Sequence, residues 1–148
     1  MKKFFLVVVF LAGITFIINA QVDGRALGLR FGFGGELSYQ HPLSEINRLE
    51  FDLGLNSWQG DLFLSGLYHV VNDLSSLADG FNWYYGAGLG AGLGENYVVV
   101  GVLGQIGIEY NLKKHPFQFS LDWRPGVFIT PVIDLGWTGV AASIRYKF

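Results

Sequence analysis

The chain has 148 residues, of which 51% are hydrophobic, 16% aromatic and only 15% charged, with 21 glycines and no cysteine. Its formal net charge of −2 argues against nucleic acid as a partner, because nucleic-acid-binding surfaces carry an excess of Lys and Arg. Without cysteine, this sequence has no disulfide, no thiolate metal site and no lipoprotein attachment site. We also expect no cofactor.

The first twenty residues have the pattern of a secretory signal peptide. Lys2 and Lys3 precede a mostly apolar run over residues 4–18, and Ile18-Asn19-Ala20 fits the small-residue cleavage pattern. The run is short for a membrane span and no stop-transfer pattern follows, although a retained anchor helix is the alternative. We expect cleavage after Ala20. Residues 21–148 would then form one domain with 8 basic residues (10 minus two lysines), 12 acidic residues and a net charge of −4.

After residue 20, apolar and polar residues alternate along most of the chain, which is the period of β-strands. No apolar run there approaches the roughly 18 residues that a spanning helix needs. Strands are predicted at residues 25–33, 36–41, 48–55, 62–70, 83–94, 98–111, 117–124 and 138–148. The fourth alternates less cleanly, because Phe63 and Leu67 share its polar phase with Ser65 and His69.

The connections between these strands are short and rich in turn-forming residues. They are predicted at residues 41–47, 56–60, 72–80, 94–96 and 113–116, while Pro125 and Pro131 bracket a tail of the seventh strand. Strands that follow one another at near-regular spacing indicate an up-and-down meander without a second domain.

The number of strands depends on how residues 25–41 are divided. One continuous strand gives seven strands in total, whereas a two-residue hairpin turn at Gly34-Gly35 gives eight. Single-chain bacterial barrels have an even number of strands. We therefore predict an all-β fold, a transmembrane antiparallel up-and-down β-barrel of eight strands.

Three features favour an apolar phase that faces outward over a soluble barrel. Glycines occupy the polar phase of residues 83–94, the chain has three lysines after residue 20, and aromatic residues gather near strand ends. One predicted aromatic girdle comprises Phe33, Trp58, Tyr97, Phe128 and Trp137. The other comprises Tyr39, Trp83, Tyr85, Tyr110, Phe117, Tyr146 and Phe148.

The polar phase would then line the lumen with equal numbers of both charges. The basic residues are Arg30, Arg48, Arg124, Arg145 and Lys147, and the acidic residues are Glu36, Glu50, Asp52, Glu109 and Asp122. Eight strands enclose a space that side chains can fill, and buried charges must be paired. The sequence therefore predicts a self-plugged lumen with a network of ion pairs.

Three segments resemble small outer-membrane β-barrel proteins of Gram-negative bacteria: GFNWYYGAGLGAGLG (Gly80–Gly94), GQIGIEYNLKKHPFQFSLDWRPG (Gly104–Gly126) and SIRYKF (Ser143–Phe148). The resemblance implies export through the periplasm to the cell outer membrane and contact with outer-membrane lipids. It also implies that the barrel-assembly machinery reads the closing strand, in which Tyr146 and Phe148 form the insertion signal. We expect a monomer. Such families often carry a long surface loop after the fifth strand, whereas residues 94–96 are short here, which weakens a receptor-like role.

Candidate catalytic residues are few. Asp61, Ser65 and His69 share one phase of a strand, but four residues along a strand span about 13 Å, too far for a local triad. No two histidines have metal-ligand spacing, and the glycine run at residues 86–90 lies inside a strand rather than before a helix. We predict a non-catalytic barrel with a structural or envelope-interaction role. The alternatives are a narrow pore, a small-ligand or lipid-binding barrel, and a lipid-modifying outer-membrane enzyme.

Overall fold

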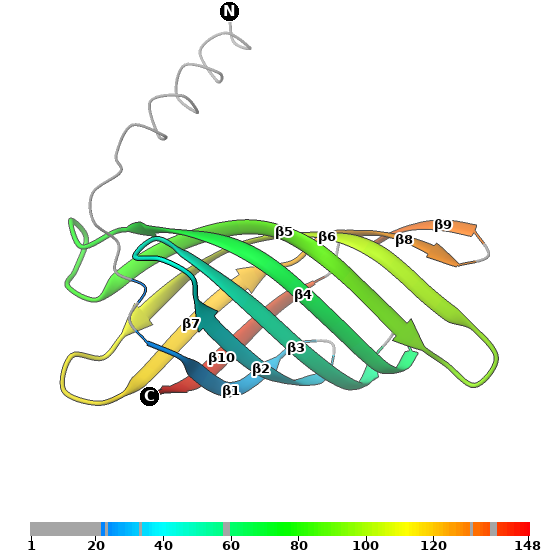
Figure 1. The fold of residues 1–148 in the computed structure, drawn as a ribbon, viewed down its shortest axis with the longest axis horizontal. Helices are drawn as coiled ribbons and strands as arrows, with labels where there is room; N and C mark the ends of the chain where they lie inside the picture. Colours follow the sequence, from blue (N-terminus) through cyan, green and yellow to red (C-terminus); the bar gives the residue numbers. More distant parts are fainter. Residues whose placement is uncertain (1–21, 23, 33, 58–59, 131, 137–138) are drawn as a thin grey trace, which may run out of the picture.

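The computed structural model describes residues 22, 24–32, 34–57, 60–130, 132–136 and 139–148, whose regular elements are all β-strands (Figure 1). The strands are β1 (Ala26–Phe31), β2 (Gly35–Pro42), β3 (Asn47–Ser57), β4 (Gly60–Asp73), β5 (Phe81–Leu93), β6 (Val98–Asn111), β7 (Phe117–Trp123), β8 (Gly126–Thr130), β9 (Val132–Gly136) and β10 (Val140–Lys147). The described part of the chain contains no helix long and apolar enough to cross a membrane.

The strands close into an eight-stranded antiparallel barrel, as predicted. Each strand from β1 to β7 pairs with the next, and β10 pairs with both β7 and β1. The tail of the seventh strand is β8, which continues along β6 after Pro125, a residue with no N–H to donate to the ladder. Strand β9 pairs with β8 and precedes β10 in the eighth strand.

The barrel has a strong stagger. Following paired residues from Leu29 through β2, β3, β4 and β5 leads to Val100 on β6. Following them through β10 and β7 leads to Tyr110 on the same strand. The offset of ten residues between Val100 and Tyr110 is the shear, which for eight strands gives a tilt of about 40° and a radius of about 8 Å. Side chains can fill an interior of this width.

The first hairpin differs from the predicted turn. Phe31 pairs with Gly35, so the connection is residues 32–34 and Gly35 belongs to β2. The predicted two-residue turn at Gly34-Gly35 is therefore wrong, although a turn in this region does divide the run into two strands. The reason is register: a two-residue turn there would place the apolar phase of one strand opposite the charged phase of the other. The three-residue connection pairs Arg30 with Glu36, and both face the lumen.

The β8–β9 hairpin extends the wall at the end of the barrel opposite the chain termini (Figure 1). Gly126 pairs with Gly136, whereas Trp123 pairs with Val140. Three positions on one strand thus face four on the other, the count of a β-bulge. The extra residue shifts the pairing of the eighth strand against the seventh by one position between β9 and β10.

Exposure alternates along the strands with the apolar side chains outward. Leu53 on β3, Val102 on β6 and Leu121 on β7 are exposed, whereas Asp52 and Asp122 beside them are buried. A soluble barrel would have the opposite arrangement, with its apolar phase inside. The predicted orientation of the two faces is confirmed for these strands.

An apolar cluster fills part of the lumen: Phe63, Leu67, Val99, Leu103 and Phe128. The prediction that Phe128 belongs to an outer girdle is wrong. It continues the lumenal phase of the seventh strand, so its ring packs edge-on against Phe63, with 6.2 Å between centroids. Gly101 provides the space, because a Cβ there would lie 2.5 Å from Cδ1 of Phe128. Gly90 likewise leaves room for the Phe63 ring.

The aromatic side chains at the end that holds the chain termini form the outward girdle that the sequence predicts. Tyr146 and Phe117 meet edge-on at 5.8 Å, and Trp83 stacks on Tyr85 at 5.5 Å. Phe148 is exposed beside them. At the opposite end Tyr97 is exposed, while Phe33, Trp58 and Trp137 lie outside the described residues.

Candidate functional site: the charged lumen

Four arginines from different parts of the barrel project into the lumen. Arg30 lies on β1, Arg48 on β3, Arg145 on β10, and Arg124 follows β7 just before the proline that ends this strand. Each is at most 7% exposed. Because inward and outward side chains alternate, the polar phase of each strand places its guanidinium inside the barrel.

Arg124 contacts three carboxylates from across the lumen. Its Nη1 lies 3.2 Å from Oε2 of Glu36, and its Nη2 lies 3.1 Å from Oε1 of Glu50 and 2.5 Å from Oδ2 of Asp52. Its Nε donates to Oε1 of Gln105 at 3.3 Å. One guanidinium therefore joins β2, β3 and β6 to the seventh strand.

Arg145 is fully buried and anchors the neighbouring layer. Its Nη2 lies 3.1 Å from Oε2 of Glu50, its Nε donates to Ser38 at 3.0 Å and its Nη1 donates to Ser120 at 2.9 Å. Glu50 also accepts from Gln40 Nε2 at 2.6 Å. With Gln105 Nε2 donating at 3.3 Å as well, Glu50 accepts hydrogen bonds from two arginines and two amides, as a buried carboxylate requires.

Arg30 forms a third group of contacts, with carboxylates on β2 and β7. Its Nη2 lies 2.6 Å from Oδ1 of Asp122 and its Nη1 lies 2.9 Å from Oε2 of Glu36. Tyr84 also donates its hydroxyl to Asp122 at 3.4 Å. Because Glu36 contacts both Arg30 and Arg124, these two groups form one continuous network.

Arg48 closes the network towards the end that holds the chain termini. Its Nη1 lies 2.7 Å from Oε2 of Glu109, and its guanidinium lies 4.7 Å above the ring centroid of Tyr84. It also donates from Nε to Nδ1 of His69 at 3.4 Å, while His69 Nε2 lies 3.1 Å from the acceptor Oε1 of Gln105. Together these contacts assign the imidazole proton to Nε2 and make His69 neutral.

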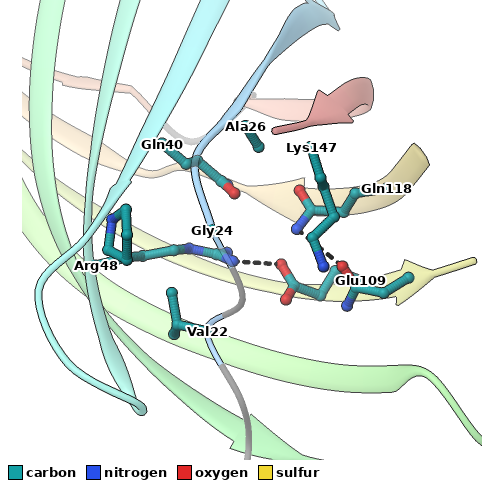
Figure 2. A pocket seen from close by; sticks show the side chains of 10 residues that line it. Val22, Gly24, Ala26, Gln40, Arg48, Glu109, Gln118 and Lys147 are labelled. Atoms are coloured by element: carbon teal, nitrogen blue, oxygen red, sulfur yellow. Dashed lines mark hydrogen bonds and ion pairs between the residues drawn. The ribbon is translucent and has the colours of Figure 1, made fainter. Parts of the chain in front are cut away.

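Lys147, predicted to line the lumen with the arginines, lies half-buried at its mouth. It points into a cavity of about 10 Å³, room for about one water molecule, which Arg48, Glu109 and Gln118 also line (Figure 2). The other nine predicted charges lie inside: Arg30, Arg48, Arg124, Arg145, Glu36, Glu50, Asp52, Glu109 and Asp122. The four arginines and five carboxylates have a formal sum of −1. Tyr146 and Phe148, the predicted insertion signal, lie on the outward face and at the end of β10.

Sequence reasoning missed the uncharged members of the network. Gln105 and Gln118 bridge charged or polar groups in the lumen, and four more side chains each bond one charged group: Gln40, Ser38, Ser120 and Asn82. Their signal was present, since they occupy the same strand phase as the charges. What they contribute is hydrogen bonding that ion pairs alone leave incomplete.

The arrangement offers little for catalysis. Asp61 is exposed, Ser65 contacts Asp52 and Arg124, and His69 contacts Arg48 and Gln105. Nucleophilic catalysis needs a hydroxyl and a base in direct contact, and Ser65 and His69 are directed to different partners. Among the described residues, no group of three His, Cys, Asp or Glu could hold a metal ion.

No protein-family model matches the sequence, and no curated protein or solved structure matches it either. The resemblance to small outer-membrane barrels therefore stays a prediction.

Proposed function

We propose that the protein is an integral outer-membrane β-barrel with a self-plugged polar lumen and a non-catalytic structural role in the envelope. The observation that carries this proposal is the inversion of its two faces. Arg145 and Glu50 are fully buried, whereas Leu89, Val102 and Ile129 are each at least 60% exposed. Soluble proteins rarely expose apolar patches above a few hundred square ångströms, so a barrel with this exterior needs an apolar solvent.

The height of the apolar wall fits a bilayer. On β5, outward residues run from Trp83 to Leu93, ten residues that rise about 33 Å along the strand. At a tilt of about 40° this corresponds to about 25 Å, the height of the lipid-facing band of outer-membrane barrels. The aromatic girdle of Tyr146, Phe117 and Phe148 borders this band at the end that holds the chain termini.

The lumen favours a plug over a pore. Arg124 reaches carboxylates on β2 and β3 from the opposite wall, so its side chain crosses the interior. Beyond this layer, Phe63, Leu103 and Phe128 pack together. An ion would have to displace both a paired layer and an apolar layer. The proposed partners are therefore outer-membrane lipids on the outside, and the barrel-assembly machinery through Tyr146 and Phe148, with the barrel itself monomeric.

Membrane fractionation combined with a heat-modifiability gel tests this proposal. The predicted signal peptide, residues 1–20, supports export, so the protein should be found in the outer-membrane fraction. The unboiled sample should migrate differently from the boiled one, since a folded barrel resists unfolding by detergent. Recovery as a soluble periplasmic protein without a mobility shift would refute the proposal.

A further inference from the structure

The basic residues outside the lumen gather in one place. Eight basic residues follow residue 20, and four of them are the lumenal arginines. Lys113, Lys114 and Lys147 line an open cleft of about 360 Å³ together with His115. Arg25 is adjacent, because its backbone forms two hydrogen bonds with Phe148, which also lines the cleft. Three of the four remaining cations therefore line one cleft, with the Lys147 side chain directed towards the lumen mouth (Figure 2) and Arg25 next to Gly24 in the chain.

This cleft lies where lipid headgroups would be. Phe148 lines the cleft directly. Phe117 and Tyr146 of the aromatic girdle adjoin two other lining residues in the chain, Pro116 and Lys147. Aromatic girdles of membrane barrels mark the interface between hydrocarbon and headgroups. One acidic side chain contacts the cluster, since Asp79 lies 2.7 Å from Lys113 and this hydrogen bond lowers the pKa of Asp79. Lys114 adds a second exposed charge beside it.

A second hollow lies deeper on the same wall. It is an apolar groove of about 310 Å³ on the outer face, formed across β5, β6, β7 and β10. Its outward walls are Trp83, Ile106, Ile108, Leu121, Trp123 and Val140. Gly107 contributes only backbone to the floor, since a Cβ there would point into the lumen towards Tyr84 and Asp122.

The cleft and the groove are spaced for one lipid molecule. Strand β7 begins at Phe117, next to the cleft, and reaches the groove at Leu121. Four residues along this strand cover about 13 Å, or about 10 Å of depth at the tilt of the barrel. The hydrocarbon of one leaflet is about 15 Å deep, so a lipid with its phosphate in the cleft can place an acyl chain in the groove.

We propose that this wall binds an anionic phospholipid, with its phosphate group in the basic cleft and one acyl chain in the apolar groove. The proposal depends on the membrane location proposed above. The lysines provide attraction for the negative headgroup, which is a recurrent mode of lipid recognition by basic clusters at a membrane surface. The groove provides the shape that holds one chain against the barrel.

Native mass spectrometry of the folded barrel in a neutral detergent tests both halves. The probes are phosphatidylglycerol and phosphatidylcholine with identical acyl chains. Wild-type protein should retain phosphatidylglycerol with an affinity about tenfold higher than for phosphatidylcholine. The K113Q/K114Q variant should lose this preference while it binds phosphatidylcholine as before. Equal retention of the two lipids by the wild type would overturn the proposal.

A charge-matched variant separates the cleft from net charge. Asn96 is exposed at the opposite end of the barrel, so K114Q/N96K has the wild-type net charge with one cation moved. The single variant K114Q should have a lower preference for phosphatidylglycerol than the wild type. The preference of K114Q/N96K should stay equally low. Restoration of the preference would show general electrostatic attraction and contradict a cleft-specific site. Full displacement of the lipid by inorganic phosphate would equally contradict the assignment to a lipid headgroup.

The groove has its own matched pair of variants. Val140 lines it, and Val100 is similarly exposed on the outward face of β6 outside it. V140F should fill the groove and weaken both lipids about equally, whereas V100F should leave binding unchanged. Equal binding by V140F and V100F would refute the acyl site. Heat-modifiability is measured on every sample to show that the barrel is folded. A folded barrel without lipid preference contradicts the lipid site but not the proposed outer-membrane barrel.

Discussion

Replacing Arg124 with alanine should expose how much the lumen depends on paired charges. The side chain is 5% exposed and contacts Glu36, Glu50 and Asp52. Without it, Glu36 keeps Arg30 and Glu50 keeps Arg145, whereas Asp52 keeps, among the described residues, a 3.5 Å contact with Ser65. The formal charge of the nine lumenal groups falls from −1 to −2.

Removing one partner of a buried ion pair costs about 3–5 kcal/mol, because an uncompensated charge stays buried. We expect Arg124→Ala to lie near 4 kcal/mol, because it leaves one carboxylate without a cation. Reversible urea unfolding in lipid vesicles, followed by tryptophan fluorescence, measures the difference. Lys114→Ala is the control, since loss of an exposed cation should change the free energy of unfolding by less than about 1 kcal/mol.

A second substitution isolates the orphaned charge. Adding Asp52→Asn to Arg124→Ala removes the carboxylate left unpaired and should recover part of the lost stability. The double-mutant cycle should then give a favourable coupling energy between Arg124 and Asp52. If Arg124→Ala lowers the free energy of unfolding no more than the Lys114→Ala control, the lumenal ion pairs do not stabilise the barrel and the prediction is wrong.

Three further substitutions address the outer face, the closing strand and the lumenal Gly90, and a conductance measurement addresses the plug. Leu53→Arg places a charge against lipid and should destabilise the vesicle-inserted barrel by about 2–4 kcal/mol, whereas an unchanged urea midpoint would mean that this face does not contact lipid. Replacing Tyr146 and Phe148 with Ser should impair insertion but not export, so the heat-modifiable fraction in the outer membrane should fall; normal amounts would contradict the proposed insertion signal. Gly90→Leu should collide with Phe63 and cost about 1–3 kcal/mol by overpacking, measured by the same urea titration. Planar bilayers with wild-type protein should show no discrete conductance steps. Steps that change when Arg124 is neutralised would show that the lumen conducts ions and is not plugged.

Alternation along the chain was enough to predict most of the strands and the direction of their charged side chains, although β9 was not predicted. Side chains alternate between the faces of a strand whatever surrounds it, so the inward direction of Arg48, Asp122 and Arg145 follows from local geometry. The eight-strand count followed from the even number of strands in single-chain bacterial barrels, with Gly34-Gly35 as the place for the additional turn. Neither conclusion required knowledge of which strands pair.

The alternation pattern does not determine the register between neighbouring strands. Alternation runs unbroken through residues 25–41, and this parity excludes a two-residue turn, but it does not choose among connections with an odd number of residues, such as the three-residue one that pairs Arg30 with Glu36. The same holds for Phe128, which was assigned outward from its position near a strand end. Its direction depends on how the seventh strand continues past Pro125 along β6, where Gly101 leaves space for the ring.

The partners of each charge were decided only when the barrel closed. Arg124 reaches Asp52 on a strand 72 positions away, and no local pattern encodes that separation. The ten-residue shear sets which inward side chains share a level of the lumen, and shear is a property of the closed sheet rather than of any strand. The sequence by itself therefore determined which residues face inward, while the tertiary structure decided which of them meet, because a local period has no information about the stagger between strands.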